Sequence, residues 1–446
     1  MKLPRYPKYK ESGVKWLGQV PENWKVLPLK FLTKKIGSGI TPRGGSEVYC
    51  EEGVLFLRSQ NVYDDGLHLD EVVFIPLEID EEMSSTRVRP GDILLNITGA
   101  SLGRTALVPD GFARANVNQH VCIIRMSETA PRDFIAYAMK SSAIKEQIML
   151  SQNGAAREGL NFVQIGGLHL GVPPDNKEAQ AISIFIDQEV AKVDVLIAEQ
   201  QLLIELLKEK RQAIISHAVT KGIRPDVPMK PSGIDWIGDV PAHWEVERSR
   251  WLFAERDQRS KTGEEEMLTV SHLTGVTRRS EKNVTMFEAA TNEGYKLCHE
   301  GDLVINTLWA WMGAMGIAPV FGIVSPAYNV YIPGKRLWPN YVDLLVRMPL
   351  FAQEVTRYSK GVWTSRLRLY PEGLYQAYLP VPPLDEQKAI AQYIADENTR
   401  IESLMIAANK SIELLQERRS TFISNAVTGQ IDVRNYRPEE APAVCQ

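Results

Sequence analysis

The residue types and spacings that catalytic sites require are missing from this chain of 446 residues. It has no Gly-x-x-x-x-Gly-Lys-Ser/Thr phosphate loop, and no Gly-x-Gly-x-x-Gly opens a helix after a strand. The seven histidines lie singly, without a His-Glu-x-x-His motif or a His/Cys cluster at metal-ligand spacing. The sequence therefore predicts a protein that is not an enzyme and that holds no metal ion or cofactor of its own.

Two kinds of segment come near to catalytic motifs. Val172-Pro173-Pro174 and Val381-Pro382-Pro383 lack the leading Asn or Asp and the aromatic residue of the Asn/Asp-Pro-Pro-aromatic loop of DNA amino-methyltransferases. Asp385-Glu386-Gln387-Lys388 contains the acidic-x-Lys pattern of some nucleases, which the matching Asn176-Lys177-Glu178 does not keep. Because Pro and acidic residues are both favoured at the start of a helix, we interpret these segments as helix starts.

Polar and basic loop residues instead suggest contacts with DNA. Asn and Gln match adenine and Arg matches guanine in the major groove, and small residues let backbone amides approach phosphate. In the first half of the chain the candidates are Thr41, Arg43, Arg58, Gln60, Asn61, Thr98, Ser101, Arg104, Asn118, Gln119, Arg157 and Asn161. In the second half they are Ser271, His272, Arg278, Asn306, Trp309, Trp311, Tyr328, Asn329, Lys360, Trp363 and Arg366. For any one of these residues, the alternative is an ordinary solvated loop.

Overall charge and composition neither require nor exclude a nucleic-acid partner. The net charge is −4, but residues 347–368 hold five cations against Glu354 alone, and only the local field matters to a bound polyanion. No apolar run approaches the roughly 20 residues that a membrane-spanning helix needs, and MKLPRYPKYK has no apolar signal-peptide region. The four cysteines lie far apart and form no CxxC pair, which favours a reducing, cytoplasmic compartment without disulfides.

A tandem repeat organises these residues. Residues 9–26 match residues 229–246, including Trp16 with Trp236 and Trp24 with Trp244. Residues 204–220 match residues 412–428, and Gly91–Asn96 matches Gly301–Asn306. Between the matched segments the halves differ, as in residues 259–290. A constant frame with two divergent inserts indicates one scaffold that presents two different specificities.

Hydrophobic periodicity predicts the elements that position the candidate residues. Residues 179–219 form a three/four-spaced apolar seam, at Ile182, Ile186, Val190, Val193, Leu196, Ile197, Leu203, Leu207, Ile214 and Ala218. The second copy of the seam is Ile390, Ile394, Ile401, Leu404, Ile412, Leu415, Phe422 and Ala426. The simplest arrangement packs these two long helices together; two independent surface helices are the alternative. The globular parts predict an α+β class, with helices over Arg132–Ile148 and Pro339–Tyr358 and strands over residues 72–75, 91–96, 120–125 and 303–305.

The ordered set of repeated segments resembles the specificity (DNA-recognition) subunit of type I restriction–modification systems. The resemblance rests on the leaders SGVKWLGQVPENW and SGIDWIGDVPAHW, the strands GDILLNITG and GDLVINTLW, the helix starts VPPDNKEAQ and VPPLDEQKAI, and the helix ends IELLKEKRQAIISHAVT and IELLQERRSTFISNAVT. It covers the chain to about residue 431. One departure is at residues 306–311, where bulky aromatics replace the small-residue loop 98–103, so contacts expected of the first loop do not carry over to the second.

The resemblance implies two globular α/β target-recognition domains joined by two long helices that pack as an antiparallel coiled coil, in an internal pseudo-two-fold repeat. The expected parts are residues 1–172 (first recognition domain), 173–223 (first long helix), 224–380 (second recognition domain), 381–431 (second long helix) and 432–446 (C-terminal tail). Each domain would read one half of a split target in double-stranded DNA. The helices would set the half-site spacing and dock two methylation subunits, which a restriction subunit joins. S-adenosylmethionine, ATP and Mg²⁺ would belong to those partners.

Two other functions stay open on the residues alone. A stand-alone nuclease or methyltransferase with fused recognition domains would need a cofactor loop or a catalytic cluster. A purely structural coiled-coil adaptor would not need two long, divergent inserts rich in Arg, Asn and Gln.

Overall fold

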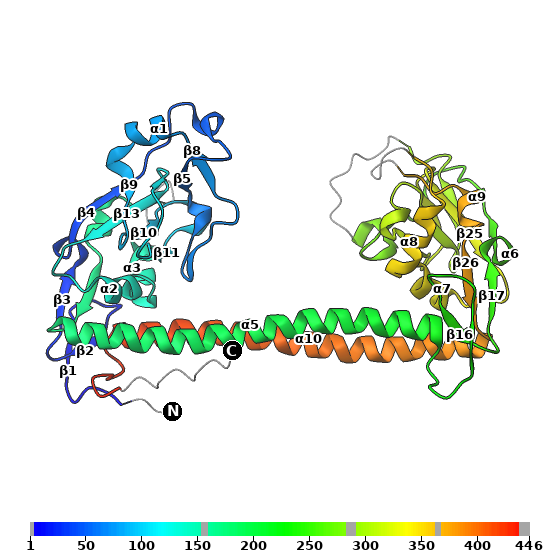
Figure 1. The fold of residues 1–446 in the computed structure, drawn as a ribbon. Helices are drawn as coiled ribbons and strands as arrows, with labels where there is room; N and C mark the ends of the chain where they lie inside the picture. Colours follow the sequence, from blue (N-terminus) through cyan, green and yellow to red (C-terminus); the bar gives the residue numbers. More distant parts are fainter. Residues whose placement is uncertain (1–3, 153–158, 282–290, 362–366, 437–446) are drawn as a thin grey trace. The chain divides into compact units, whose positions relative to one another are not determined.

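The computed structural model describes residues 4–152, 159–281, 291–361 and 367–436 (Figure 1). The chain divides into two compact units: unit 1 is residues 1–200 with 410–446, and unit 2 is residues 201–409. Each unit therefore contains one globular part together with one half of each long helix.

The long helices are α5 (Asn176–Lys221) and α10 (Leu384–Val427). In unit 1 the start of α5 and the end of α10 contribute to one hydrophobic core, which includes Ile182 and Ile423 (Figure 1). In unit 2 the end of α5 and the start of α10 share a core that includes Val219 and Ile390. Early residues of one helix pack with late residues of the other in both units, so the pairing is antiparallel, as the resemblance implied.

The apolar seam of α5 differs from the predicted one in its middle. Val193 is 3% exposed and Ile204 is 9% exposed, whereas the predicted seam residues Leu196 and Leu203 are each 41% exposed. The buried positions follow alternating steps of four and three residues through Val193, Ile197, Gln200, Ile204 and Leu207, the spacing of a heptad seam. Leu196 and Leu203 each lie one residue before that seam and so face outward, as does Leu404 of α10, at 53% exposed.

The globular part of unit 1 is built on two four-stranded sheets. One has the order β11-β10-β13-β4 and is antiparallel throughout. The other has the order β8-β5-β12-β9, in which β5 and β12 run parallel. The bounds of these strands are Thr33–Ser38 (β4), Val54–Leu57 (β5), Val73–Ile75 (β8), Arg87–Val88 (β9), Ile93–Asn96 (β10), Thr105–Leu107 (β11), Ala115–Val117 (β12) and Val121–Met126 (β13). Strands predicted near residues 72–75, 91–96 and 120–125 are thus confirmed, as β8, β10 and β13.

Short paired strands and helices complete unit 1. The strand pairs are β1 (Tyr9–Glu11) with β2 (Gln19–Pro21), β3 (Lys25–Pro28) with β14 (His169–Val172), and β6 (Val62–Tyr63) with β7 (Gly66–Leu67). The helices are α1 (Leu77–Glu82), α2 (Arg132–Met139), α3 (Ser142–Ser151) and α4 (Phe162–Gly166). The single helix predicted over Arg132–Ile148 is wrong, because Ser141 leaves the helical conformation and caps α3 by accepting a hydrogen bond from the Ile144 amide.

Unit 2 repeats part of this architecture. Its largest described sheet has the order β18-β25-β22-β23, with the bounds Phe253–Glu255, Tyr328–Pro333, Leu303–Asn306 and Met315–Ile317. The other strand pairs are β15 (Met229–Pro231) with β16 (Asp239–Pro241), β17 (Glu245–Arg248) with β26 (Tyr378–Val381), β19 (Leu268–Ser271) with β20 (Gly275–Arg278), and β21 (Lys296–Cys298) with β24 (Gly322–Val324). The strand predicted at residues 303–305 is confirmed as β22.

The helices of unit 2's globular part are α6 (Ser249–Leu252), α7 (Pro339–Val346), α8 (Pro349–Arg357) and α9 (Pro371–Leu374). The single helix predicted over Pro339–Tyr358 is therefore also wrong. Met348 has extended backbone before Pro349, which begins α8, because proline disfavours helical backbone in the residue that precedes it.

The segment expected to be a tail begins as part of unit 1. Val433 is 2% exposed, and the Asp432 amide donates to the Pro4 carbonyl at 2.8 Å. The ring of Tyr436 packs edge-on against Phe185 of α5, with centroids 4.9 Å apart. Residues near the two ends of the chain thus meet beside α5. No helix among the described residues has the length and apolar content needed to cross a membrane.

Candidate nucleic-acid interface

A turn, a strand and a short loop hold the first set of candidate residues in unit 1. The Asp92 carboxylate accepts a hydrogen bond from the Arg89 amide at 2.7 Å and forms an ion pair with Arg125 at 2.7 Å, which fixes the turn before β10. After β10 the chain forms a 3-10 turn, η5 (Gly99–Ser101), and returns through Gly103 to β11. Gly103 has a φ of +84°, a conformation that a residue with a side chain rarely adopts.

The loop between β10 and β11 borders an open hollow of about 440 Å³. Several predicted DNA-contact residues from separate parts of the sequence meet there. Its lining consists of Ser59, Gln60, Tyr63, Thr98, Gly99, Ala100, Ser101, Arg104 and His120. The hollow therefore offers hydroxyl, amide, imidazole and guanidinium groups over a floor of small residues.

A chain of hydrogen bonds orders one rim of this hollow. The Thr41 hydroxyl donates to Oε1 of Gln119, at 2.5 Å, and Nε2 of Gln119 lies 2.9 Å from Nε2 of His120. The other ring nitrogen, Nδ1 of His120, lies 2.6 Å from Oγ1 of Thr98. Because the Gln119 amide donates to Nε2, the proton of a neutral His120 ring is on Nδ1 and points to Thr98. Asn118 holds the turn by accepting from the His120 amide at 3.1 Å.

Arg104 lies at the hollow with its guanidinium over an aromatic ring. Its central carbon is 4.5 Å from the centroid of Tyr63, and the Tyr63 ring is itself stacked on His68 at 4.2 Å and 16°. Tyr63 was not among the predicted contact residues. A signal for it exists in the sequence, because Tyr63 alternates with the buried Val62 in a short strand and so must face away from the core.

Three of the predicted contact residues of unit 1 form hydrogen bonds within their own local structure. Asn61 is 1% exposed; its Oδ1 accepts from the Arg58 amide at 2.9 Å and its amide donates to the His68 carbonyl at 2.9 Å. Both polar groups of the Asn61 side chain thus form hydrogen bonds within its own loop. We therefore correct the predicted contact set by removing Asn61. Asn161 caps α4 by accepting from the Gln164 amide at 2.9 Å. Arg58 donates to the Glu71 carbonyl at 3.0 Å.

The remaining candidates of unit 1 are exposed or outside the described residues. Arg43 is exposed in the loop after Thr41, and Gln60 is exposed at the hollow. Arg157 lies outside the described residues, so the structure places nothing there.

Unit 2 repeats the frame but fills the loop with aromatic rings. The Asp302 carboxylate accepts from the His299 amide at 2.7 Å and pairs with Arg256 at 2.7 Å, as Asp92 does in unit 1. After β22 the loop forms a 3-10 turn, η7 (Ala310–Met312), and Gly313 has a φ of +86°. Trp309 is 49% exposed in this loop. The two loops thus share their length and a left-handed glycine before the next strand, while their 3-10 turns are offset by one residue and the surfaces that they present differ.

The other candidates of unit 2 divide in the same way between structure and surface. Asn306 is 8% exposed, and Asn329 accepts a hydrogen bond from Lys296 at 3.0 Å. The indole N–H of Trp311 donates to the Leu308 carbonyl at 3.1 Å. Tyr328 is half-buried, and burial raises its pKa.

Four further candidates of unit 2 lie among the described residues, two of them at strand ends, and two lie outside the described residues. Ser271 accepts from the Leu273 amide at 3.2 Å, His272 and Arg278 are exposed, and Lys360 lies 6.0 Å from the ring centroid of Tyr370. Trp363 and Arg366 lie outside the described residues.

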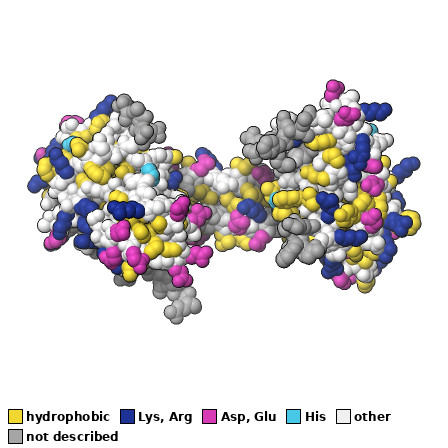
Figure 2. Space-filling model, turned by 90° about the horizontal axis from the view of Figure 1, so that it is seen from above, with side chains coloured by type: hydrophobic (Ala, Val, Ile, Leu, Met, Phe, Trp, Pro, Cys, Tyr) yellow, Lys and Arg dark blue, Asp and Glu magenta, His cyan; other side chains and the backbone are white. Residues whose placement is uncertain are grey.

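The basic cluster predicted at residues 347–368 is more neutral than its sequence suggests. Arg347 pairs with Asp343 at 3.2 Å, and Arg357 lies 3.4 Å from Glu354 and 3.9 Å from Asp235. Figure 2 shows Lys and Arg side chains interspersed with acidic and apolar ones on the face that it presents of each unit. On the described residues that this view shows, the candidate contacts therefore lie on individual loops.

A second repeated site lies where each long helix begins. Glu178 accepts from the indole N–H of Trp24 at 2.9 Å and from the Tyr6 hydroxyl at 2.7 Å. Glu386 accepts from the indole N–H of Trp244 at 2.9 Å, and its other oxygen lies 2.7 Å from Nε2 of His243. Both halves thus have a glutamate at this place, although Gln180 stands in the first half where Lys388 stands in the second, so the first half lacks the acidic-x-Lys pattern.

The surroundings of Glu386 explain its role. Burial alone would raise its pKa, but the hydrogen bonds from Trp244 and His243 outweigh burial and hold the pKa below its usual value. The neighbouring Gln387 is 0% exposed and donates to the Arg336 and Pro382 carbonyls, both at 2.8 Å. The acidic-x-Lys pattern at residues 385–388 is thus engaged in holding the helix start, in agreement with its interpretation as a helix start.

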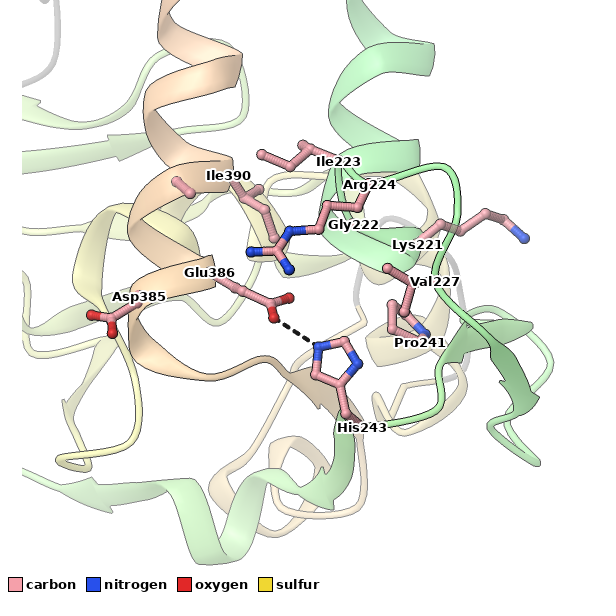
Figure 3. Close-up of a pocket in the computed structure, with 11 residues that line it drawn as sticks. Lys221, Gly222, Ile223, Arg224, Val227, Pro241, His243, Asp385, Glu386 and Ile390 are labelled. Atoms are coloured by element: carbon pink, nitrogen blue, oxygen red, sulfur yellow. Dashed lines mark hydrogen bonds and ion pairs between the residues drawn. The ribbon is translucent and has the colours of Figure 1, made fainter.

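A cavity of about 180 Å³ lies beside this carboxylate in unit 2 (Figure 3). The Glu386 carboxylate, the His243 ring and the Arg224 guanidinium face one another across it, whereas Lys221 points away. Ile223, Val227 and Ile390 supply apolar walls. Among the described residues, no group of three or more His, Cys, Asp or Glu side chains is arranged to hold a metal ion.

The architecture matches a solved chain from a study of complex assembly and conformational transition of the type I restriction–modification system. The match has a TM-score of 0.61 at 15% identity and covers 92% of this chain and 98% of that one. This likeness establishes the class of fold: two globular parts on a pair of long helices. No family model matches the sequence.

Relatives in sequence carry the same description. A Methanocaldococcus jannaschii chain, provisionally named the MjaX specificity subunit of a type I restriction enzyme, is 21% identical over 439 residues, covering 96% of this chain and 98% of the relative. The EcoKI specificity subunit of Escherichia coli is 25% identical over 207 residues, which is 45% of this chain and 44% of the relative. These matches confirm the resemblance: the chain is a relative of type I restriction enzyme specificity subunits over nearly its whole length.

Proposed function

We propose that this chain is the DNA-binding specificity subunit of a type I restriction–modification complex. Each globular part reads one half of a bipartite target in double-stranded DNA, and the long helices set the spacing between the halves. The observation that carries the proposal is the repeated frame: Asp92, β10 and Gly103 recur as Asp302, β22 and Gly313, while the loops between them differ. Selection for two different DNA sequences on one scaffold accounts for this pattern.

Assembly with methylation and restriction subunits follows from the same proposal. Two methylation subunits dock on the helices, and a restriction subunit joins them. Exposed apolar side chains on the helix segments of unit 2 support such docking, since large exposed patches mark interaction sites. These side chains are Leu202 (60% exposed), Leu206 (51%), Leu404 (53%) and Ile406 (62%).

Catalysis and its cofactors belong to the partners in this proposal. S-adenosylmethionine serves the methylation subunits, and ATP with Mg²⁺ serves the restriction subunit, in the cytoplasm. The engagement of Glu386 in the helix start, and of Asp80 with Arg87, leaves these acidic groups in structural contacts.

Methylome sequencing tests the proposal. Cells without endogenous adenine methylation are given this chain, its methylation subunit, or both. We expect adenine methylation at one bipartite motif only when both are present, since the chain directs the partner to its target. The matched biochemical control incubates the purified chain alone with DNA and labelled methyl donor. Methyl transfer or cleavage by the chain alone would contradict the assignment, as would methylation by the partner at the same motif without the chain.

A further inference from the structure

The guanidinium of Arg104 is used differently from those of the two ion-paired arginines Arg125 and Arg87 of its unit. Arg125 pairs with Asp92 at 2.7 Å, and Arg87 pairs with Asp80 at 2.7 Å. Among the described residues no side-chain hydrogen bond or ion pair is formed by Arg104; its guanidinium lies over the Tyr63 ring instead. Five N–H donors are thus left toward the hollow by a group that can never lose its proton.

The aromatic support limits where those donors can lie. Tyr63 is held by the His68 ring, at 4.2 Å and nearly parallel, and His68 is in turn 3.1 Å from Asp65. A guanidinium that lies 4.5 Å over a ring has fewer positions open to it, and its planar fork suits two parallel hydrogen bonds. This arrangement prepares Arg104 for a flat, two-acceptor partner.

The rest of the hollow leaves room for the edge of a base pair. Gly99, Ala100 and Ser101 form part of its floor, while Gln60 and His120 stand beside Arg104. The same register in unit 2 has Ala314, which is 1% exposed, in place of Arg104. Trp309 and Trp311 replace Gly99 and Ser101 there. The Arg104 guanidinium over the Tyr63 ring is therefore a feature of unit 1 that the repeated frame does not require.

We propose that Arg104 reads a guanine in the DNA half-site that unit 1 recognises, by donating from its fork to O6 and N7 of that base in the major groove. Tyr63 is the positioning residue that holds the fork. This inference rests on the proposed function of the chain and names the base that one of its loops selects. Arg on guanine is the commonest specific contact of this kind, with each good pair contributing about 1–3 kcal/mol of discrimination. A phosphate contact is the competing role, since the same fork also fits two phosphate oxygens, and the base analogues and variants below distinguish the two.

The first experiment substitutes Arg104 in the complex with its methylation subunit, once methylome sequencing has given the motif. Duplexes carry every single-base change in both half-sites, and kcat/KM for methylation is measured on each. We expect Arg104→Ala to lower kcat/KM on the cognate duplex about tenfold to a hundredfold. The variant should no longer distinguish guanine from other bases at one position of one half-site. The other half-site is the internal control and should keep its full discrimination.

Two base analogues test the hydrogen bonds themselves. 7-Deazaguanine lacks the N7 acceptor, and hypoxanthine keeps N7 and O6 but lacks the minor-groove amine. We expect 7-deazaguanine at the assigned position to reduce methylation by the wild-type complex and to have no further effect on Arg104→Ala. Hypoxanthine should be accepted by the wild type almost as well as guanine.

Two further comparisons separate base reading from phosphate binding: Arg104→Lys against Arg104→Ala, and Tyr63→Phe against Tyr63→Leu. Arg104→Lys keeps the charge but loses the planar fork, so we expect it to lose discrimination at the assigned position. Tyr63→Phe keeps the aromatic ring under the guanidinium and should retain base discrimination at the assigned position. Tyr63→Leu removes the ring and should lose that discrimination, while the other half-site keeps its own. Thermal melting of each variant shows that unit 1 stays folded.

Several results would overturn the inference while leaving the proposed function intact. These are a first half-site without guanine, no effect of 7-deazaguanine, or an Arg104→Ala variant that weakens all duplexes equally and reduces the salt dependence of binding by about one phosphate contact. Rescue of full discrimination by Arg104→Lys would do the same. Failure of the wild-type complex to methylate any bipartite motif would instead count against the proposed function itself.

Discussion

The two units of the chain agree in what holds them together and differ in what they present. Trp24 and Trp244 are both fully buried, and each donates its indole N–H to a carboxylate of a long helix at 2.9 Å. In each loop a left-handed glycine, Gly103 or Gly313, turns the chain back. Between such fixed points, a hollow with a cation in unit 1 corresponds to a pair of tryptophans in unit 2. The two units therefore share the contacts that stabilise their fold. They differ in the loop side chains, which we expect to give each unit its own function.

The base of each unit shows a second difference. In unit 1 Tyr6 donates to Glu178 at 2.7 Å, and Arg434 lies 4.8 Å from the Tyr6 ring. In unit 2 His243 takes the place beside the carboxylate, Ile223 is 40% exposed, and the cavity of about 180 Å³ remains. Segments near both chain ends line a hollow of about 160 Å³ at this site in unit 1, whereas the linker after α5 lines the corresponding cavity in unit 2.

The largest effect is expected from removing the shared indoles. Trp24→Ala should destabilise unit 1, and Trp244→Ala should destabilise unit 2, each by about 3–5 kcal/mol, because removal of a fully buried aromatic leaves a cavity and takes one of two hydrogen bonds from the carboxylate. Denaturant unfolding gives the magnitude, and hydrogen exchange with mass spectrometry shows which unit opens. Trp251→Ala is the matched control, since Trp251 is 71% exposed and should change stability by less than about 0.5 kcal/mol. If either buried indole were dispensable, the two units would not share one folding frame.

A buried carboxylate cluster distinguishes unit 1 from unit 2 in its response to acid. Asp80 is 0% exposed and is held by Arg87, Asn116 and Arg114. Burial would raise its pKa, but the hydrogen bonds from these three groups outweigh burial and lower it. Asp80→Asn should cost about 1–3 kcal/mol at pH 7, less than a fully buried pair because the guanidinium groups remain partly exposed.

The pH dependence has a definite sign. Because the pKa of Asp80 is lower in the folded chain than its unfolded value of about 3.9, the cluster stabilises unit 1 above that value and loses this effect as the pH falls through the folded pKa. The stability gap between wild type and Asp80→Asn should therefore be constant near neutral pH and shrink below about pH 4. Hydrogen exchange of unit 1 peptides measures this stability difference at each pH. A difference between wild type and Asp80→Asn that grows as the pH falls would contradict the assignment.

Exchanging a whole globular part should change recognition and leave stability nearly unaltered. Replacing residues 1–172 with those of a relative of different target should alter one half of the methylated motif only, because each globular part has its own core and frame. Methylome sequencing reads both halves at once. Simultaneous change of both halves would show that the units do not read DNA independently.

A smaller exchange tests the loops alone. Residues 98–104 and 308–314 have equal length between equivalent strands, with Gly103 and Gly313 in register. Placing 308–314 in unit 1 should keep the fold and lower methylation of the cognate motif about tenfold to a hundredfold, with discrimination lost at the first half-site only. Loss of folding, seen in thermal melting, would show that the loop serves the frame after all.

Pattern in the sequence predicted the frame well and the site only in part. The repeat, the two long helices and strands β10 and β22 could be predicted because they depend on local spacing and on apolar residues that recur. The role of Asn61 could not, since its partner is the His68 carbonyl and the turn that brings them together has no repeat in unit 2. Tyr63 was missed because its neighbour Arg104 is distant in sequence.

The match of Glu178 with Glu386 was missed for a different reason. The Val-Pro-Pro starts differ by 209 positions, 172 against 381, whereas the helix ends differ by 208, 204 against 412. The second copy therefore has one more residue between the Val-Pro-Pro segment and the helix end. When the two copies are aligned on the prolines, the residues of the first helical turn are matched one position out of register. Only the shared indole partners, Trp24 and Trp244, reveal the correct register.

The smallest change concerns spacing without any change in the bases read. Helix α5 continues through the boundary between the units at residues 200 and 201, and α10 does so at residues 409 and 410. Four residues inserted after Glu199, with four more after Asn409, add about 6 Å to each helix and slightly more than one turn, so the seam register is largely kept. Since one base pair rises about 3.4 Å, the gap between the methylated half-sites should grow by one or two base pairs. A matched variant with two residues at each position rotates the seam by about half a turn and should lose assembly instead. Methylome sequencing reads the gap, and thermal melting reports folding. An active four-residue variant with an unchanged gap would show that the helices do not set the spacing. A longer gap with identical half-sites would show that the helices set the spacing and the globular parts select the bases.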